Sequence, residues 1–449
     1  MSFPQRAFAF PKSGSLTLAL ALASGVALAV PPQVLAQAAP ASRAEPSFAR
    51  PERVGMSPSR LELLTRAFDK EIAAKQLPGA VIMVARRGQI VYAKAFGQRD
   101  PSSPDAMRLD SIFRIYSMTK PMATVGAMLL VEDGILQPGD AVSKWLPAFK
   151  DLKVFNGNTA ETVAAARVMT VQDLMRHTSG LGYGEITANQ AFKDALTAAG
   201  IYKPGVIDFD IRNLSAQEFT ERLAKVPLAQ QPGTVWEYSL STDLLGRVVE
   251  AASGKRLGDF MAERIFKPLR MNDTAFSVPD AKKGRVAASF DKDPVNGTPF
   301  RLIDVSKPPG NDSGGAGAVS TAPDYLRFAQ MLLNGGVLDG RRIMSRATIK
   351  YMASDHLAGR IPIAPTIGGG VLSNANYTFG LGVAVRPGDG FVNAPGSAGD
   401  FYWGGYAGTY FWVDPKEQVT AVIMMQSPGV QRAFHRNLLR QLVYQAITD

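Results

Sequence analysis

The chain has 449 residues, 46% of them hydrophobic, and a formal net charge of +10 at pH 7. That length and apolar content are ample for a large core, in one big domain or two interlocked ones. The absence of cysteine excludes disulfides, thiolate metal ligands, a cysteine nucleophile and a lipid-modified N-terminal cysteine. Because the basic residues are scattered rather than clustered, the charge indicates a solvated surface and no nucleic-acid groove.

The first 36 residues have the pattern of an export signal. Arg6 and Lys12 supply positive charge, residues 15–30 form an apolar run, and Val34-Leu-Ala36 is a small-residue cleavage site. The run is short for a bilayer span, although a retained anchor is the alternative. We therefore expect an exported protein, periplasmic or secreted, with no stable membrane anchor.

Helical and strand patterns follow the signal. A linker rich in Pro, Ala and Ser covers residues 37–46, and residues 57–75 have helical periodicity. Residues 80–85 and 89–96 are apolar runs on either side of a turn at Arg86-Arg-Gly88, which predicts a β-hairpin.

From about residue 136 to 310 the pattern is typical of helices joined by long polar loops. Helices are predicted over residues 171–176, 215–225 and 241–252. The stretch 183–213 fits no regular element, and we expect it to form part of a lid or substrate wall.

The last third of the chain returns to sheet. Strands are predicted over residues 377–385, 410–413 and 419–425, and helices over 320–333 and 429–447. Sheet and helix at both ends predict an α+β fold. We expect one α/β domain built from residues 37–135 and 311–449, with an all-α or mainly helical domain of residues 136–310 inserted.

A candidate nucleophile precedes an apolar helix pattern. The run Arg114-Ile-Tyr-Ser117-Met-Thr-Lys120-Pro121 leads into the apolar residues 122–131, which predict a helix buried on all sides. A serine hydroxyl needs a proton acceptor to attack, and Lys120 lies on the same helix face as Ser117. A desolvated amine there is available as a base.

The Ser-x-x-Lys spacing is weak by itself, because it also fits an ordinary polar helix start. A second match, Ser289-Phe-Asp-Lys292, leads into Asp293-Pro-Val-Asn-Gly297. That sequence is a turn signal rather than a buried helix. The context therefore favours Ser117.

Two further segments complete a pattern with Ser117-Met-Thr-Lys120: Trp236-Glu-Tyr238-Ser-Leu-Ser-Thr-Asp243-Leu-Leu-Gly246 and Trp403-Gly-Gly-Tyr-Ala-Gly-Thr409. The pattern resembles the serine β-lactamase and penicillin-binding protein superfamily, and most closely the family VIII carboxylesterases, which are similar to class C β-lactamases. Recurring segments of that family also match His177-Thr-Ser-Gly-Leu181, residues 314–328 and Phe379-Gly-Leu-Gly382. The resemblance implies an antiparallel sheet flanked by terminal helices.

The resemblance also implies roles for individual residues. Ser117 matches the acylated nucleophile, Lys120 the neighbouring base, and Tyr238 the tyrosine that relays a proton to the leaving group. The backbone N–H groups of Ser117 and Tyr406 would form the oxyanion hole. No cofactor is implied, and no Gly-x-Ser-x-Gly elbow offers a competing serine.

Two departures from the lactamase pattern bear on the substrate. Leu240 stands where those enzymes have asparagine, and Trp403 where they have the lysine that helps to hold a carboxylate. Apolar groups at both positions favour a neutral acyl substrate, because a cationic side chain is the natural partner of a carboxylate. Tyr116, Trp403 and the glycines Gly404 and Gly405 are the expected substrate-binding residues.

Aromatic residues near these motifs offer an apolar acyl pocket, although we expect about half of them to be core only. They are Tyr116, Trp236, Phe401, Tyr402, Trp403, Tyr406 and Tyr410.

Other polar residues fit other roles less well. The three histidines, His177, His356 and His435, lack metal-ligand spacing, so we expect no metal site. His177 is the alternative base of a serine triad, but its Thr-Ser-Gly surroundings indicate a turn that ends a helix. Asp243 fits a helix start better than a catalytic acid.

Together these features predict an exported serine carboxylesterase that acts on a small-molecule ester through an acyl-enzyme. The alternatives on the same machinery are a β-lactamase, a D-alanyl carboxypeptidase, an amidase or an acyl transferase. An alternative of another class is a ligand-binding protein that kept the fold without catalysis.

Overall fold

The computed structural model describes residues 48–204, 211–373 and 376–449. They belong to one compact unit that spans residues 46–449. The expected export signal and most of the linker after it lie outside the described residues. Within the described ranges, no helix is both long enough and apolar enough to cross a membrane.

A seven-stranded sheet with the order β2-β1-β13-β12-β11-β10-β9 forms the centre of the fold. Its strands are β1 (Gly79–Arg86), β2 (Gln89–Gly97), β9 (Thr378–Phe379), β10 (Ala384–Val385), β11 (Phe401–Gly404), β12 (Gly408–Asp414) and β13 (Val419–Gln426). Every neighbouring pair is antiparallel. This arrangement confirms the predicted α+β class and the predicted hairpin of β1 and β2.

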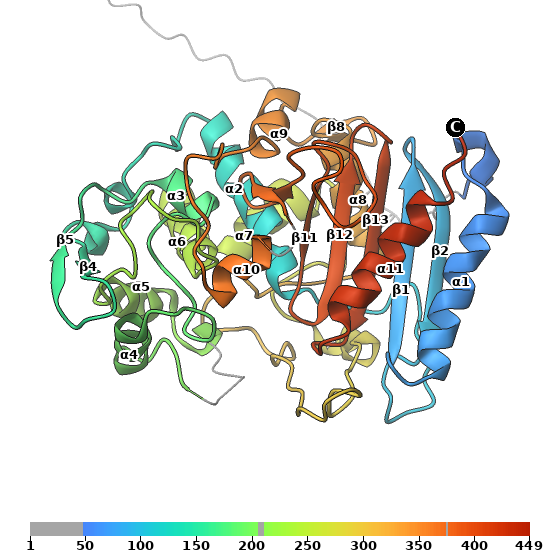
Figure 1. Cartoon of the computed structure of the whole chain (residues 1–449), viewed down its shortest axis with the longest axis horizontal. Helices are drawn as coiled ribbons and strands as arrows, with labels where there is room; N and C mark the ends of the chain where they lie inside the picture. The colour runs from blue at the N-terminus through green and yellow to red at the C-terminus, as the bar shows by residue number, and fades with distance from the viewer. Residues whose placement is uncertain (1–47, 205–210, 374–375) are drawn as a thin grey trace, which may run out of the picture. The chain divides into compact units, whose positions relative to one another are not determined.

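Helices cover both faces of the sheet, which explains why β1 and β13 are apolar and buried along their whole length. The terminal helices α1 (Pro58–Ala73) and α11 (Arg432–Tyr444) pack together on one face (Figure 1). Helix α8 (Ala322–Leu333) packs on β1, β12 and β13 from the other face. Alternate side chains of β1 point to opposite faces of the sheet. Ile82 belongs to the core cluster beneath the terminal helices, and Val81 belongs to the larger cluster beneath α8.

The prediction of a single strand over residues 377–385 is wrong. The segment folds into two short strands, β9 and β10, which pair with each other. Gly382 has a φ of +75° in the turn between them, a conformation that glycine adopts at little cost. A Cβ on Gly380 would lie 2.2 Å from the carbonyl oxygen of Met352, so the turn also needs glycine for close packing.

The regular elements in the middle of the chain are mainly helices joined by long loops, as predicted. These helices are α3 (Val171–Met175), α4 (Gln190–Ala198), α5 (Ala216–Ala224), α6 (Ser241–Ser253) and α7 (Leu257–Met261), which continues as a π-helix (Ala262–Phe266). A short hairpin of β4 (Lys153–Phe155) and β5 (Thr162–Ala164) departs from the all-α expectation. The unassigned stretch 183–213 holds α4 and a 3₁₀ turn (Ile211–Asn213), and residues 205–210 lie outside the described ranges.

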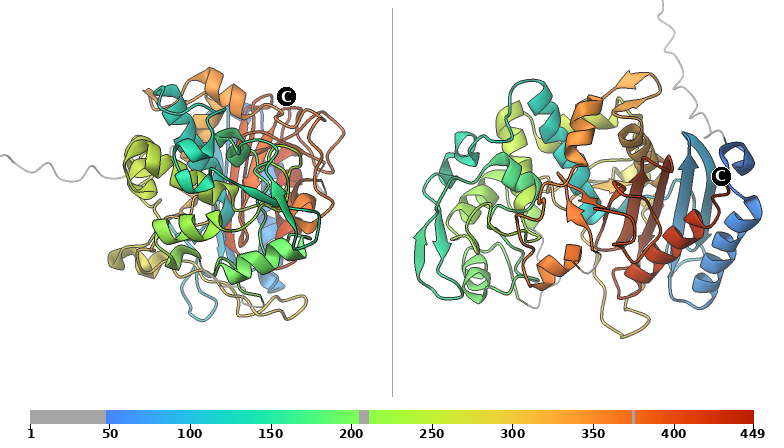
Figure 2. Two further views of the ribbon diagram at one scale, coloured as in Figure 1. Left: turned by 90° about the vertical axis from the view of Figure 1, so that its left-hand side faces the viewer. Right: turned by 45° about the horizontal axis from the view of Figure 1, so that its top comes forward.

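Helix α2 (Thr119–Glu132) joins this helical region to the sheet. It contacts α6 and α7, and the helical region lies to one side of the sheet in Figure 1 and in the right-hand view of Figure 2. The predicted boundaries of an inserted domain at residues 136 and 310 stay a prediction, because residues 46–449 form one unit.

The remaining elements are short. They are the 3₁₀ turns Pro51–Val54, Tyr116–Met118, Val142–Lys144, Pro147–Phe149 and Asp280–Arg285, the strands β3 (Phe113–Arg114), β6 (Val319–Ser320), β7 (Val337–Leu338) and β8 (Arg341–Arg342), and the helices α9 (Arg346–Met352) and α10 (Ile367–Ser373).

Candidate active site

Ser117 lies on the 3₁₀ turn Tyr116–Met118, which leads directly into α2. The predicted buried helix is present but begins at Thr119, two residues after the serine. Every residue of α2 from Thr119 to Leu130 is buried, as the apolar run predicts. Ser117 itself is only half-buried and stays within reach of solvent.

The turn that carries Ser117 is strained and held in place. Tyr116 has a φ of +44°, which is unusual for a bulky residue. The Thr119 hydroxyl donates to the carbonyl of Tyr116 at 2.7 Å, and the Tyr325 hydroxyl donates to that of Met118 at 2.8 Å. The hydroxyl of Tyr116 accepts a hydrogen bond from the backbone N–H of Ile303 at 3.0 Å.

Lys120 is 1% exposed, and its amine has three oxygen partners. Nζ lies 3.4 Å from Ser117 Oγ, 3.0 Å from the Tyr183 hydroxyl and 2.7 Å from the carbonyl oxygen of Gly315. The structure therefore places serine and lysine on one face, as their spacing predicts. A buried amine with this geometry can exchange a proton with the serine.

Tyr238 lies just before α6, with its ring beside the lysine. The Lys120 amine is 4.6 Å from the centroid of that ring. The Tyr238 hydroxyl is buried and has no hydrogen-bond partner among the described residues. An unpaired buried hydroxyl is costly, so this atom is ready to bond to a group that enters the site.

The β11–β12 turn packs on the nucleophile turn from the sheet side. The N–H of Gly405 donates to the Thr409 carbonyl at 2.8 Å, and the Thr409 hydroxyl donates to the carbonyl of Ile115 at 3.2 Å. A Cβ on Gly405 would lie only 2.3 Å from that Ile115 oxygen, so glycine is required there. The ring of Tyr406 meets that of Tyr116 edge to face, with 5.4 Å between their centroids.

The structure thus brings together the residues predicted for the site. Gly404 ends β11, and Trp403, 3% exposed, packs its ring 5.4 Å from that of Tyr238. The catalytic roles of Ser117, Lys120 and Tyr238, and the oxyanion role of the Tyr406 N–H, remain predictions.

Two residues beside Lys120 were missed as site residues. The Tyr183 hydroxyl contacts both the Lys120 amine and, at 3.5 Å, the Asp243 carboxylate. Asp243 is on the first turn of α6, as predicted, but its Oδ1 accepts hydrogen bonds from the Ser313 hydroxyl and, at 3.2 Å, from the Gly315 N–H. Tyr183 follows the family-like segment 177–181, and that adjacency was the only signal available for it.

His177 is a packing residue behind Tyr238. It is 1% exposed, its Nδ1 lies 3.1 Å from the Ser239 hydroxyl, and its ring centroid is 4.9 Å from that of Tyr238. Burial, followed by the charge of Lys120, holds the pKa of His177 well below 6.5. The ring is therefore neutral at ordinary pH.

The predicted aromatic wall is divided between the two faces of the sheet. Trp236, Phe401 and Trp403 belong to the same core cluster as Tyr238. Tyr410 belongs instead to the cluster beneath the terminal helices, and the Tyr402 ring packs on it with 5.3 Å between centroids. Tyr402 and Tyr410 are therefore core residues.

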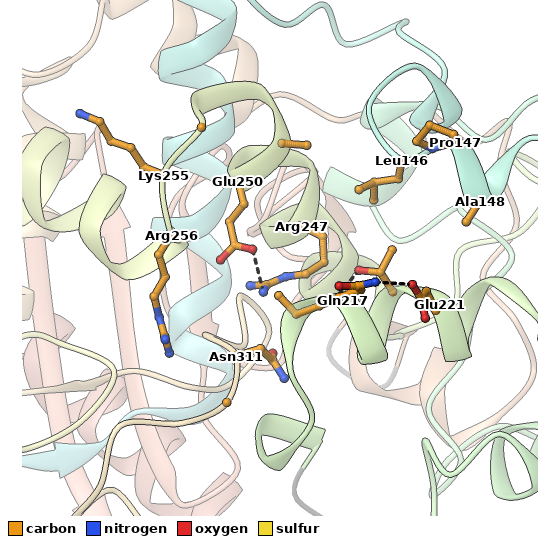
Figure 3. A pocket seen from close by; sticks show the side chains of 15 residues that line it. Leu146, Pro147, Ala148, Gln217, Glu221, Arg247, Glu250, Lys255, Arg256 and Asn311 are labelled. Atoms are coloured by element: carbon orange, nitrogen blue, oxygen red, sulfur yellow. Dashed lines mark hydrogen bonds and ion pairs between the residues drawn. The ribbon is translucent and has the colours of Figure 1, made fainter.

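A separate surface groove of about 690 Å³ lies between α5, α6 and the loop at residues 310–311 (Figure 3). An ion pair at 2.9 Å joins Arg247 to Glu250 in its wall. None of the predicted catalytic residues is among its described lining residues. Elsewhere in the described ranges, no three His, Asp or Glu side chains gather where they could hold a metal ion.

The antiparallel sheet covered on one face by the two terminal helices, with a serine and a buried lysine at the start of a central helix, defines the class of β-lactamase-like serine hydrolases. The chain belongs to the β-lactamase family, whose family model matches residues 64–445. This match confirms the resemblance read from the motifs.

Similar proteins include an esterase, a hydrolase with promiscuous acyltransferase activity and a simvastatin synthase. Esterase EstB of Burkholderia gladioli is 32% identical over 374 residues, which cover 78% of this chain and 86% of EstB. The solved structure of EstCE1, a hydrolase with promiscuous acyltransferase activity, has 23% identity and a TM-score of 0.70, and covers 86% of this chain and 99% of its own. The solved structure of unliganded simvastatin synthase LovD from Aspergillus terreus has 22% identity and a TM-score of 0.69. The match covers 86% of this chain and 98% of the LovD chain.

Proposed function

We propose that the protein is a serine carboxylesterase that cleaves small neutral esters through an acyl-enzyme on Ser117. The observation that carries the proposal is the buried Lys120 amine, 3.4 Å from the Ser117 hydroxyl oxygen. The likeness to Esterase EstB supports ester hydrolysis over the other reactions of the family.

In the proposed acylation, Lys120 takes the hydroxyl proton of Ser117 as Oγ bonds to the ester carbonyl carbon. The carbonyl electron pair moves onto its oxygen, where the N–H groups of Ser117 and Tyr406 would stabilise the negative charge. Loss of one such donor typically slows the reaction by about a hundredfold or more. The carbonyl then re-forms, and the alkoxide leaves with a proton relayed through Tyr238.

Deacylation repeats these steps with water. A water molecule attacks the acyl carbonyl carbon and gives its proton to the same base. The bond from the carbon to Ser117 Oγ breaks, and Oγ takes a proton back. The sum is one ester and one water converted to one carboxylic acid and one alcohol.

The side chains around the site support a neutral acyl group. Trp403 and Leu240, at the two positions where lactamases carry polar groups, are 3% and 4% exposed. The guanidinium of Arg432 lies 5.3 Å from the centroid of the Tyr406 ring. A guanidinium is a natural partner of a carboxylate. A test of substrate charge must therefore include an ester that carries a carboxylate.

A substrate panel on purified protein tests the proposal. We expect 4-nitrophenyl butyrate to be cleaved faster than 4-nitrophenyl hemisuccinate, which carries a carboxylate in place of the terminal methyl group, and faster than nitrocefin or a D-alanyl-D-alanine peptide. Ser117→Ala should remove all these activities while the thermal unfolding temperature stays close to that of the wild type.

Other results would favour another member of the class. Faster turnover of nitrocefin or of the peptide would indicate a β-lactamase or carboxypeptidase. Faster cleavage of the hemisuccinate would overturn the preference for a neutral acyl group.

A further inference from the structure

The three oxygens around the Lys120 amine differ in what they can do. The Gly315 carbonyl, 2.7 Å away, can only accept a hydrogen bond. The hydroxyls of Ser117 and Tyr183 can each donate or accept. A neutral amine has two N–H groups and one lone pair, so the direction of the Tyr183 hydroxyl decides where the lone pair points.

Asp243 gives the Tyr183 hydroxyl its direction. The carboxylate is 3% exposed, and its Oδ1 is occupied by the Ser313 hydroxyl and the Gly315 N–H. Its Oδ2 faces the Tyr183 hydroxyl at 3.5 Å, a long hydrogen bond in which only the phenol can donate. Burial, followed by the Asp243 charge, raises the pKa of Tyr183 well above 10, so the phenol keeps its single proton.

With that proton directed to Asp243, the oxygen of Tyr183 can only accept from Lys120. Tyr183 and Gly315 then take both N–H groups of the neutral amine, and the lone pair is left facing Ser117. We propose that Asp243 and Tyr183 are a positioning pair that aims the Lys120 lone pair at the nucleophile. The proposal rests on the proposed role of Lys120 as the base.

The other titratable groups around the amine do not oppose this arrangement. The Tyr238 ring offers its face to Nζ at 4.6 Å, a contact that does not depend on the direction of its hydroxyl. His177 is neutral because burial lowers its pKa. Two of the hydrogen-bond partners of Lys120, Tyr183 and Gly315, each contact the carboxylate of Asp243.

Two variants separate positioning from simple support. Tyr183→Phe removes the acceptor without removing the ring. Asp243→Asn keeps an oxygen for the two donors on Ser313 and Gly315 but presents an N–H to Tyr183. The phenol must then accept from Asn, and its proton is free to occupy the lone pair of Lys120.

The rate to measure is the reaction of Ser117 with a fluorophosphonate, followed by intact mass across pH, beside the acylation burst with 4-nitrophenyl acetate. In the fluorophosphonate reaction the Oγ–P bond forms, the P–F bond breaks, fluoride leaves and the serine proton goes to Lys120. We expect each variant to be slowed by about 10- to 100-fold, part of what general base catalysis typically contributes.

The double variant and the pH profile give the sharper test. Tyr183→Phe with Asp243→Asn should be no slower than Tyr183→Phe alone, because the carboxylate acts through the phenol. The acid limb of the pH profile should move to lower pH in Asp243→Asn, because this variant lacks the negative charge beside the Tyr183 hydroxyl. Tyr92→Phe, which removes a half-buried phenol hydroxyl that pairs with Thr65 away from the site, should react at the wild-type rate.

Single variants that keep more than half the wild-type rate, or effects that multiply in the double variant, would overturn the positioning pair. A wild type that is phosphonylated with the expected dependence but cleaves no ester would overturn the proposed function and leave the pair intact. A Ser117 that reacts with neither reagent would overturn both.

Discussion

Tyr116 and Lys120 show how single residues prepare the serine between them. The left-handed backbone of Tyr116, with its φ of +44°, costs on the order of 1–3 kcal/mol. Hydrogen bonds to its carbonyl and its hydroxyl hold that conformation. Burial of the Lys120 amine is also unfavourable alone, and the Gly315 carbonyl and the Tyr183 hydroxyl offset part of that cost.

At this scale the chain segment around Ser117 was predictable, because three residues of sequence fix the position of Lys120 on a helix face. Tyr238 was predictable from its motif. Tyr183 and Gly315 were not, because they reach Lys120 from loops that are 63 and 195 positions away in sequence, and neither loop has a periodic pattern.

His177 gives a residue-scale prediction for stability against pH. Its pKa lies well below 6.5 in the folded chain because it is buried, and near 6.5 in the unfolded chain. Below that pH the unfolded state binds a proton that the folded state excludes, so the free energy of unfolding decreases by up to about 1.4 kcal/mol per pH unit. The stability that comes from the neutral, buried imidazole is fully present above the pKa of the unfolded chain and is lost as the pH falls.

His177→Asn should flatten this pH dependence between pH 6 and 5. The free energy of unfolding at pH 7.5 should be less affected. Asparagine tolerates the φ of +58° at this position. Urea denaturation at pH 7.5, 6 and 5 measures the slope. An unchanged slope would mean that the imidazole titrates alike in both states.

At the scale of elements, the site is a junction of two turns. The strands β3 and β6 pair and fix the loop with Gly315 next to the serine turn, while the β11–β12 turn packs on Ile115 from the sheet. The β1–β2 hairpin, strand β13 and helices such as α1, α2 and α8 were predictable from local periodicity, whereas α4 and the β4–β5 hairpin were not. The tight hairpin of β9 and β10 was not, because its reversal depends on packing of Gly380 against Met352.

Gly405→Ala tests this junction. The new Cβ would lie 2.3 Å from the Ile115 carbonyl oxygen and from the Thr409 hydroxyl, so one turn must move away from the other. We expect destabilisation by about 1–3 kcal/mol and a loss of ester turnover of at least tenfold, since the proposed oxyanion donors, the N–H groups of Ser117 and Tyr406, would move apart.

Gly139→Ala is the matched control for that substitution. A Cβ on Gly139 meets no atom within 4 Å, and the variant should keep wild-type turnover. Normal turnover by Gly405→Ala, measured with 4-nitrophenyl butyrate, would show that the β11–β12 turn does not set the geometry of the serine.

At the scale of the whole molecule, the first described strand pairs with the last. Ala80 of β1 lies opposite Met425 of β13, and α1 packs on α11. Composition and pattern at both ends predicted a shared α+β body, but the strand order depends on pairing between distant segments, which local sequence does not encode. The described fold places Ser117 where α2 passes between the helical region and this sheet.

The most direct test of the central claim is to trap the acyl-enzyme. Protein mixed with 4-nitrophenyl butyrate and quenched in acid during the burst should gain the mass of one butyryl group. Peptide mapping should place it on Ser117, and Ser117→Ala should show neither adduct nor burst. A butyryl group on another residue, or full hydrolysis by Ser117→Ala, would contradict the assignment of this serine as the nucleophile.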